Sequence, residues 1–198
     1  MKKTSLFLAV LCMAVLCYAQ PEVGTLSIQP KVGFNVANIT HGHGTDPRVG
    51  VVGGIELQSQ LASYVGVSYG ILYSMQGARA ENGSTKSTLK LDYVNIPIMA
   101  NVYLYKGLAL KAGIQPGFNV VDKYKVSNGG QSVTGSIADL GFKIKSFDFG
   151  IPFGLSYEFN RVVLDARYIL GMTEFAENDD DKSHHRVFQF TIGYRFSR

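Results

Sequence analysis

The chain has 198 residues, of which 46% are hydrophobic and 17% are charged, and its formal net charge is +4. Removal of Lys2 and Lys3 with a signal peptide would leave 17 of the 19 basic residues against 15 acidic ones. That balance excludes a strongly basic protein and predicts no nucleic-acid partner. Beyond the N-terminal segment, no apolar run approaches the about 20 residues that a membrane-spanning helix needs, which excludes a helical inner-membrane protein.

Residues 1–19 have the pattern of a secretory signal peptide. Two lysines precede a short apolar run, and small residues up to Ala19 predict cleavage before residue 20. The alternative is a lipoprotein anchored through Cys17, but the large Leu16 is unlike the small residue such a signal prefers. Because Cys12 and Cys17 are the chain's two cysteines, the mature protein would hold no disulfide, thiol nucleophile or cysteine metal site.

Eight segments of the remaining chain, residues 20–198, alternate large apolar residues with small, polar or charged ones. This period of two is typical of β-strands with two unlike faces. In chain order the predicted strands are residues 28–38, 48–58, 64–77, 89–105, 108–121, 147–159, 161–172 and 186–196.

Local irregularities are predicted within the fourth, fifth and sixth strands. The alternation of the fourth slips near Tyr93 and Val94, which predicts a β-bulge. Pro97, Pro116 and Pro152 fall inside predicted strands, so we expect each at a bulge or beside a local break in the ladder.

The sixth strand, FDFGIPFGLSYEF at residues 147–159, is the clearest of all. Every odd position is large and apolar, and every even position is small, polar or charged. Strands of soluble domains usually have about 5–6 residues, whereas a tilted strand that crosses a bilayer needs about 9–11. The pattern therefore predicts an all-β fold, an eight-stranded antiparallel up-and-down transmembrane β-barrel.

The predicted connections alternate between short and long. Residues 60–63, 106–107 and 160–161 are short turns, and the long polar loops are residues 40–47, 78–88, 122–146 and 173–185. Outer-membrane barrels have short periplasmic turns and long outer loops, so both termini would be periplasmic. An aromatic girdle is predicted at the short-turn end, from Tyr103, Tyr105, Tyr157, Phe159, Tyr194 and Phe196.

Four sequence segments resemble the PorT-like outer-membrane β-barrel domain proteins. They are LDYVNIPIMANVYLY at 91–105, SFDFGIPFGLSYEF at 146–159, VVLDARYILGMT at 162–173 and the ending FTIGYRF. The resemblance covers essentially all of the mature chain and implies an eight-stranded barrel in the outer membrane of a Gram-negative bacterium. The founding member of the family is linked to protein secretion, but no motif here ties the chain to that role, and none is enzymatic.

The predicted inward faces carry both signs of charge. Their charged residues are Lys31, Arg48, Glu56, Lys111, Asp148, Glu158, Asp165, Arg167 and Arg195. An eight-stranded barrel is only wide enough for side chains to fill, so these groups predict a salt-bridged plug. The alternative is a gated path for ions or small solutes, although selective pores usually show one sign.

The other candidate chemistry lies in the loops and is weak. His41, His43, His184 and His185 fall in predicted loops, as does the acidic run 179–181, and no spacing matches a zinc or calcium site. Ser68, Ser74 and Ser156 have no histidine on the same predicted surface, which predicts no catalytic residue, cofactor or metal.

The predicted role is therefore structural or interactive. The four long loops could bind a partner while the strands contact outer-membrane lipid. The alternatives are an accessory component of secretion or envelope biogenesis, a small-solute channel, and a soluble barrel that carries a ligand inside.

Overall fold

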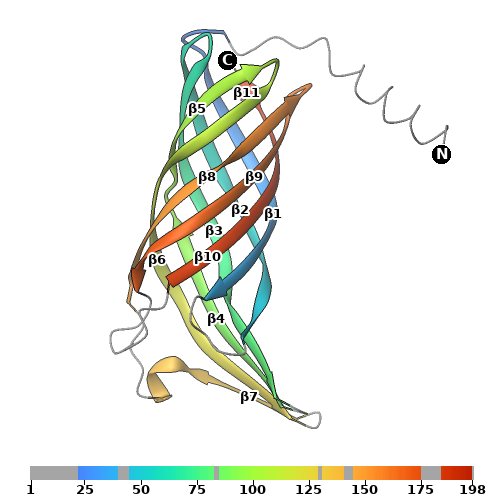
Figure 1. Ribbon diagram of the computed structural model, residues 1–198, viewed down its shortest axis with the longest axis vertical. Coiled ribbons are helices and arrows are strands. Elements are labelled where there is room, and N and C mark those ends of the chain that lie inside the picture. The colour runs from blue at the N-terminus through green and yellow to red at the C-terminus, as the bar shows by residue number, and fades with distance from the viewer. Residues whose placement is uncertain are drawn as a thin grey trace, which may run out of the picture.

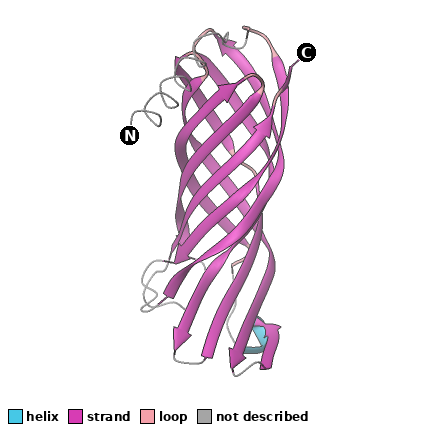
Figure 2. Cartoon of the chain, turned by 90° about the vertical axis from the view of Figure 1, so that its right-hand side faces the viewer, coloured by secondary structure: helices cyan, strands magenta, loops and turns pink. Residues whose placement is uncertain are grey.

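The computed structural model describes residues 22–39, 45–82, 85–128, 131–140, 145–174 and 184–197. Antiparallel strands coil around one axis, and the ring closes because β1 pairs with both β2 and β10 (Figure 1; Figure 2). The strands are β1 Leu26–Ile39, β2 Thr45–Ala62, β3 Val65–Asn82, β4 Thr85–Asn95, β5 Ile98–Tyr105, β6 Leu108–Asn128, β7 Gln131–Ser136, β8 Phe147–Phe159, β9 Val162–Glu174, β10 His184–Tyr194 and β11 Phe196–Ser197, and the 3-10 helix η2 is Ile137–Leu140.

Two of the wall strands are interrupted, so the ring has eight strand positions. Residues 96–97 separate β4 from β5, and both halves pair with β3. Arg195 separates β10 from β11, and both halves pair with β1. Among the described strands, β7 pairs with β6 alone and lies outside the ring. The predicted eight-stranded antiparallel barrel is confirmed.

The irregularity predicted for the fourth strand is present. The register of β4 against β6 shifts between Asp92 and Tyr93, where Val120 of β6 has no partner in β4. Pro97 lies in the adjoining break, and the N–H of the residue before it donates to the Pro116 carbonyl at 2.8 Å. Two of the prolines thus meet at one local break, where a missing backbone donor is tolerated.

β8 occupies residues 147–159, as predicted, and its odd-numbered side chains point out of the barrel. Phe153 and Leu155 are 45% and 48% exposed, whereas Gly150 and Pro152 are buried. Opposite Pro152, residues 113–114 of β6 make no ladder pair with β8, so the third proline also lies beside a local gap.

The other wall strands place apolar side chains outward in the same way. The outward set includes Val32, Phe34, Val51, Ile55, Ile71, Val102, Leu110, Ile114, Phe118, Leu164, Phe188, Phe190 and Ile192. A continuous apolar belt around a barrel is the surface that contacts lipid. None of the described helical segments has the length and apolarity to cross a membrane.

Two segments predicted as loops are strands, so their prediction was wrong. β3 continues to Asn82 and β4 begins at Thr85, which makes the predicted loop 78–88 the tip of a β-hairpin. Within the predicted loop 122–146, β6 runs on to Asn128 and is followed by β7 and η2. The result is a four-stranded sheet, in the order β3-β4-β6-β7, that extends the wall well beyond the other strands (Figure 1; Figure 2). We call residues 77–82, 85–91, 122–128 and 131–136 the protruding sheet.

The remaining predicted loops are described only in part. β2 begins at Thr45, inside the predicted loop 40–47, and β9 and β10 extend into the predicted loop 173–185. Residues 40–44 and 175–183 lie outside the described residues.

The opposite end of the barrel carries short turns and β11 (Figure 1). Asn160 and Arg161 connect β8 to β9 with φ angles of 49° and 71°. A left-handed conformation at both central residues defines a type I′ turn, whose twist matches the flanking strands. Gly107, with a φ of 85°, lies in the turn between β5 and β6.

Candidate functional site

The lumen is the most concentrated polar region of the chain. The charged residues that alternation assigned to it are all buried or half-buried: Lys31, Arg48, Glu56, Lys111, Asp148, Glu158, Asp165, Arg167 and Arg195. They lie in three layers along the barrel axis.

The middle layer is a network that we call the central ion cluster: Lys31, Glu56, Lys111, Asp165 and Arg167. The Lys31 ammonium lies 2.7 Å from Glu56 Oε2, and the Lys111 ammonium lies 2.9 Å from Asp165 Oδ2. Arg167 bridges both carboxylates, with Nη1 2.7 Å from Glu56 Oε1 and Nε 2.6 Å from Asp165 Oδ1. Three cations and two carboxylates from β1, β2, β6 and β9 thus link separate parts of the wall.

Burial makes these contacts mutually dependent. The side chains of Arg167, Glu56 and Asp165 are at most 1% exposed. A buried charge without a partner is strongly destabilising, whereas a paired and hydrogen-bonded one is tolerated. The central ion cluster therefore surrounds both carboxylates with cations, carries one positive charge in excess, and fills the lumen at this level.

The layer nearer the short turns is built around Arg195, in the break between β10 and β11. Its Nη2 lies 3.0 Å from Glu158 Oε2 and donates to Gln58 Oε1 at 3.1 Å. The Tyr103 hydroxyl accepts hydrogen bonds from the Gln58 amide and from Arg195. Alternation along residues 48–58 places Gln58 on this inward face, whereas Tyr103 was predicted to lie in the aromatic girdle.

Tyr103 corrects the predicted aromatic girdle. It is 6% exposed and points into the lumen. It lies two residues from the inward Asn101, so its position follows the alternation that restarts after Pro97. Of the other predicted girdle residues, Tyr105, Phe159, Tyr194 and Phe196 are exposed and Tyr157 is half-buried.

The third layer joins the barrel to the protruding sheet. The Arg48 guanidinium donates to the Gln76 carbonyl and has its Nη1 3.6 Å from Asp92 Oδ1. The Tyr73 hydroxyl donates to Asp92 Oδ2 at 2.7 Å. A Cβ added at Gly77 would come within 3.3 Å of Arg48 Nη1, so the missing side chain leaves room for the guanidinium. Asp92 lies between the inward Leu91 and Tyr93, on the same face of the sheet as Tyr73, so alternation alone did not predict its contact with Arg48.

Two of the serines considered for catalysis are hydrogen-bonded to amide side chains in the lumen. Ser68 hydrogen-bonds Asn101 at 3.4 Å, and the Ser74 hydroxyl accepts from the Asn35 amide at 2.7 Å. His184 begins β10 and is followed by His185, while residues 41, 43 and 179–181 lie outside the described residues. Within the described part of the chain, no three His, Cys, Asp or Glu residues form a group that could hold a metal ion.

Three layers of mixed charge suit a lumen that is closed by its own side chains. Pores that select ions are usually lined by one sign of charge. Here each described carboxylate of the middle layer and of the layer nearer the short turns lies against a cation from another part of the wall. The arrangement joins the strands across the lumen.

Comparisons with known proteins agree with this fold. The model of the outer membrane protein beta-barrel domain matches residues 18–177. The structure of Ail from Yersinia pestis in complex with the heparin analogue sucrose octasulfate is 16% identical, covers 88% of this chain and 100% of Ail, and has a TM-score of 0.50. CarO2 from Acinetobacter baumannii is 15% identical, with coverages of 89% and 100% and a TM-score of 0.50. OprG from Pseudomonas aeruginosa is 12% identical, with coverages of 90% and 99% and a TM-score of 0.48.

Identities this low show a common fold and nothing about binding. No curated protein matches the chain. The family model, in contrast, covers most of the chain, and its description agrees with the apolar belt and the polar lumen. The chain is therefore a β-barrel protein of the outer membrane and belongs to the outer membrane protein beta-barrel domain family.

Proposed function

We propose that this barrel is a closed scaffold that binds a partner through the protruding sheet and the loops beside it. The observation that carries the proposal is the central ion cluster, which fills the lumen with ion pairs while a paired sheet extends beyond the apolar belt. Binding surfaces are commonly carried by segments that a rigid scaffold positions. A barrel closed inside and extended at one end fits that role better than transport.

Conductance in planar lipid bilayers tests the closed lumen. We expect the purified, folded chain to give no steady current in symmetric salt, because ions would have to break the buried pairs. An Arg167→Ala/Asp165→Ala variant, which removes two side chains of the central ion cluster, serves as the opened comparison. A steady current from the unmodified chain would contradict the proposal and favour the small-solute channel.

We also propose that residues 1–19 are a signal peptide and that the protruding sheet lies outside the cell. The basic and apolar pattern up to Ala19 supports the first point. The second is supported by the short turns at the end of the barrel that carries β11, since such turns are periplasmic in outer-membrane barrels.

Cysteine labelling of intact cells tests this orientation. With the signal peptide removed, the chain would have no cysteine, so a single introduced thiol reports its own position. A membrane-impermeant maleimide should label Ser132→Cys in the protruding sheet on intact cells. It should label Lys106→Cys, at the opposite end, only after the outer membrane is permeabilised. The reverse pattern would place the sheet in the periplasm and overturn this part of the proposal.

The narrower affiliation and the rival role are also proposals. Residues 91–105 and 146–159 support a PorT-like barrel. An accessory role in secretion or envelope biogenesis would be favoured by co-purification with other envelope proteins. We propose no enzymatic role, because the lumen serines Ser68 and Ser74 are hydrogen-bonded to amide side chains rather than to a base.

A further inference from the structure

One face of the protruding sheet is lined with cations. The register places Lys90 of β4 opposite Lys123 of β6. Two residues nearer the tip, Thr88 of β4 lies between Arg79 of β3 and Lys125 of β6. Lys86 lies on the same face near the tip. Hydroxyl side chains fill the positions between these cations on the same face: Thr88, Ser127, Ser132, Thr134 and Ser136.

The cations of this face have few anionic neighbours. By register the face carries Glu81, which lies opposite Lys86, and it continues toward the barrel with Asp92, whose carboxylate contacts Arg48 and Tyr73. Among the residues that the structure describes, no carboxylate forms an ion pair with Lys90, Lys123 or Lys125. Like charges directly opposite each other in a sheet repel, so the Lys90–Lys123 pair destabilises the sheet unless an anion lies between them.

The opposite face of the sheet is partly covered by apolar side chains near the barrel. Leu89 and Tyr124 pack against a buried cluster of Leu91, Tyr93 and Ile137, the last of which is in η2. On the cationic face, Lys86 and Lys123 are exposed and Lys90 and Lys125 are half-buried.

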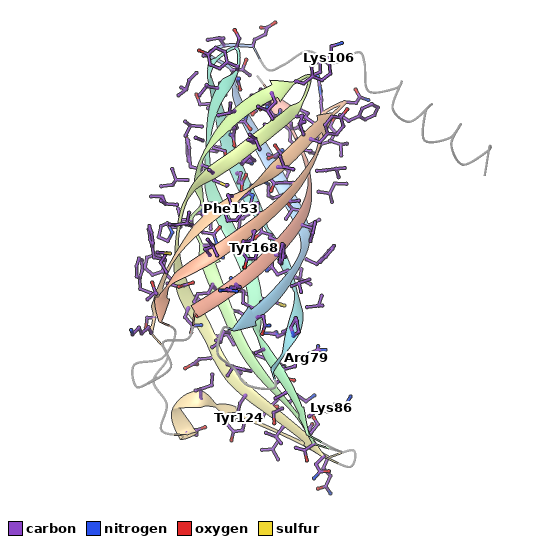
Figure 3. The ribbon with its side chains drawn as sticks, viewed as in Figure 1. Arg79, Lys86, Lys106, Tyr124, Phe153 and Tyr168 are labelled. Carbon is purple, nitrogen blue, oxygen red and sulfur yellow. The ribbon has the colours of Figure 1, made fainter. Side chains whose placement is uncertain are left out.

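The cationic face continues the lipid-facing side of the barrel. On β3 the outward residues Ile71 and Tyr73 are 61% and 39% exposed, and the same alternation leads to Arg79. Figure 3 shows Arg79 and Lys86 at the protruding end, with Lys106 at the far end of the barrel. The cations thus follow the apolar belt on the same side of the wall.

The height of Lys123 above the belt matches that of lipid headgroups, and Lys125 lies just beyond them. Val121 is the last apolar residue on the outward face of β6, and Lys123 and Lys125 follow two and four residues later. With a rise of about 3.3 Å per residue and a tilt of about 40°, these lysines lie about 5 and 10 Å beyond Val121 along the membrane normal. The headgroup layer of one leaflet is about 5–8 Å thick.

We propose that the outward face of the protruding sheet binds the phosphate groups of lipid headgroups in the outer leaflet, with Lys90 and Lys123 as its central pair. A phosphate between the two ammonium groups removes their repulsion and accepts hydrogen bonds from both. The inference rests on the proposed extracellular position of the sheet. It adds that the sheet is fixed against the membrane surface, which leaves the other face and the loops for a protein partner.

Lipid retention in detergent tests the proposal with the full-length mature chain. The folded protein is incubated with bisphosphorylated lipid A or with lipid A whose phosphates have been removed, passed through gel filtration in a nonionic detergent, and assayed for bound lipid by mass spectrometry. The test variant is Lys90→Gln/Lys123→Gln. The control variant, Lys106→Gln/Arg161→Gln, removes the same charge at the other end of the barrel. A heat-modifiable gel shift verifies that each variant is folded.

We expect the unmodified chain and the control to retain bisphosphorylated lipid A and to discriminate against the dephosphorylated form. Each lysine near an anionic surface contributes about fivefold, so the Lys90→Gln/Lys123→Gln variant should bind about 30-fold more weakly. In nonionic detergent without lipid, that variant should be at least as stable as the unmodified chain, because its like charges are gone. A role in folding alone would predict a loss of stability instead.

Three results would overturn the inference. They are equal retention by the Lys90→Gln/Lys123→Gln variant, equal retention of the two forms of lipid A, and Lys90-dependent binding of a soluble sulfated polysaccharide without binding of lipid A. None of these results affects the conductance or cysteine-labelling experiments. The closed scaffold and its orientation are therefore tested separately from the lipid contact.

Discussion

Replacement of Arg167 by methionine probes the central ion cluster most sharply. Arg167 contacts Glu56 through Nη1 at 2.7 Å and Asp165 through Nε at 2.6 Å, and its side chain is fully buried. Removal of one partner from a buried ion pair costs about 3–5 kcal/mol, because the other charge is left without compensation. The two lysines of the cluster would still neutralise the carboxylates, so we expect the lower end of that range.

The assay is urea unfolding of the chain in phosphatidylcholine vesicles, followed by tyrosine fluorescence and by the heat-modifiable gel shift. At a slope of about 2 kcal/mol per molar urea, a loss of about 3 kcal/mol lowers the midpoint by about 1.5 M. The control is Arg79→Met, which removes the same side chain from an exposed site and should change stability by less than about 0.5 kcal/mol.

A double-mutant cycle measures the interaction free energy between Asp165 and Arg167 apart from the cost of each single change. In Asp165→Asn/Arg167→Met both partners are absent, so the cost should fall short of the sum of the two single changes by about 0.5–3 kcal/mol. The reasoning would be refuted if Arg167→Met and Arg79→Met shifted the midpoint equally. That result would mean that water solvates the cluster and that the lumen is open.

Three further substitutions, two of them with a matched control, test other parts of the structure. Gly54→Ala should cost about 1–3 kcal/mol in the same urea assay, because its Cβ would clash with backbone of β3, whereas Gly53→Ala, with its nearest atom at 3.5 Å, should be tolerated. Tyr103→Phe should cost about 1–2 kcal/mol through the hydrogen bonds that it loses inside the barrel, while Tyr105→Phe, 54% exposed, should not lower the midpoint. Phe190→Arg should cost about 2–4 kcal/mol in vesicles if this outward side chain faces the bilayer midplane, and a neutral result would argue that it does not.

Most of the barrel could be predicted from the sequence because lipid on one side and a polar lumen on the other impose a period of two. β8 matches its predicted bounds, since both of its faces are subject to that constraint over the full length. The inward position of Glu56, Asp165 and Arg167 follows from the same alternation, although their pairing across the lumen does not.

The protruding sheet was predicted as loops for a physical reason. Beyond the hydrocarbon layer the outward face no longer contacts lipid tails. Polar residues such as Thr88 and Lys125 therefore occupy positions that would be apolar within the membrane. The backbone pairing continues while the pattern that reveals it disappears. Only a pairing partner, which a single sequence does not specify, shows that these residues are strands.

The two side chains whose contacts were not predicted, Asp92 and Tyr103, lie on the same wall position of the barrel. They flank the irregular stretch that contains the β-bulge and Pro97. Odd-numbered residues point inward on both sides of this stretch, including Tyr93, Met99 and Tyr103. The alternation therefore agrees with the inward position of Tyr103, which was assigned to the girdle because it is aromatic, whereas the contact of Asp92 with Arg48 does not follow from alternation.

The measurement that bears most directly on the account is the fractionation of cells that express the full chain, followed by electrophoresis of boiled and unboiled samples. A closed barrel with an outward apolar belt should be found in the outer-membrane fraction, require detergent for extraction and migrate differently until it is boiled. Recovery of the chain from the periplasm or the medium without detergent would contradict the account, because the exposed aromatic and aliphatic belt would then face water.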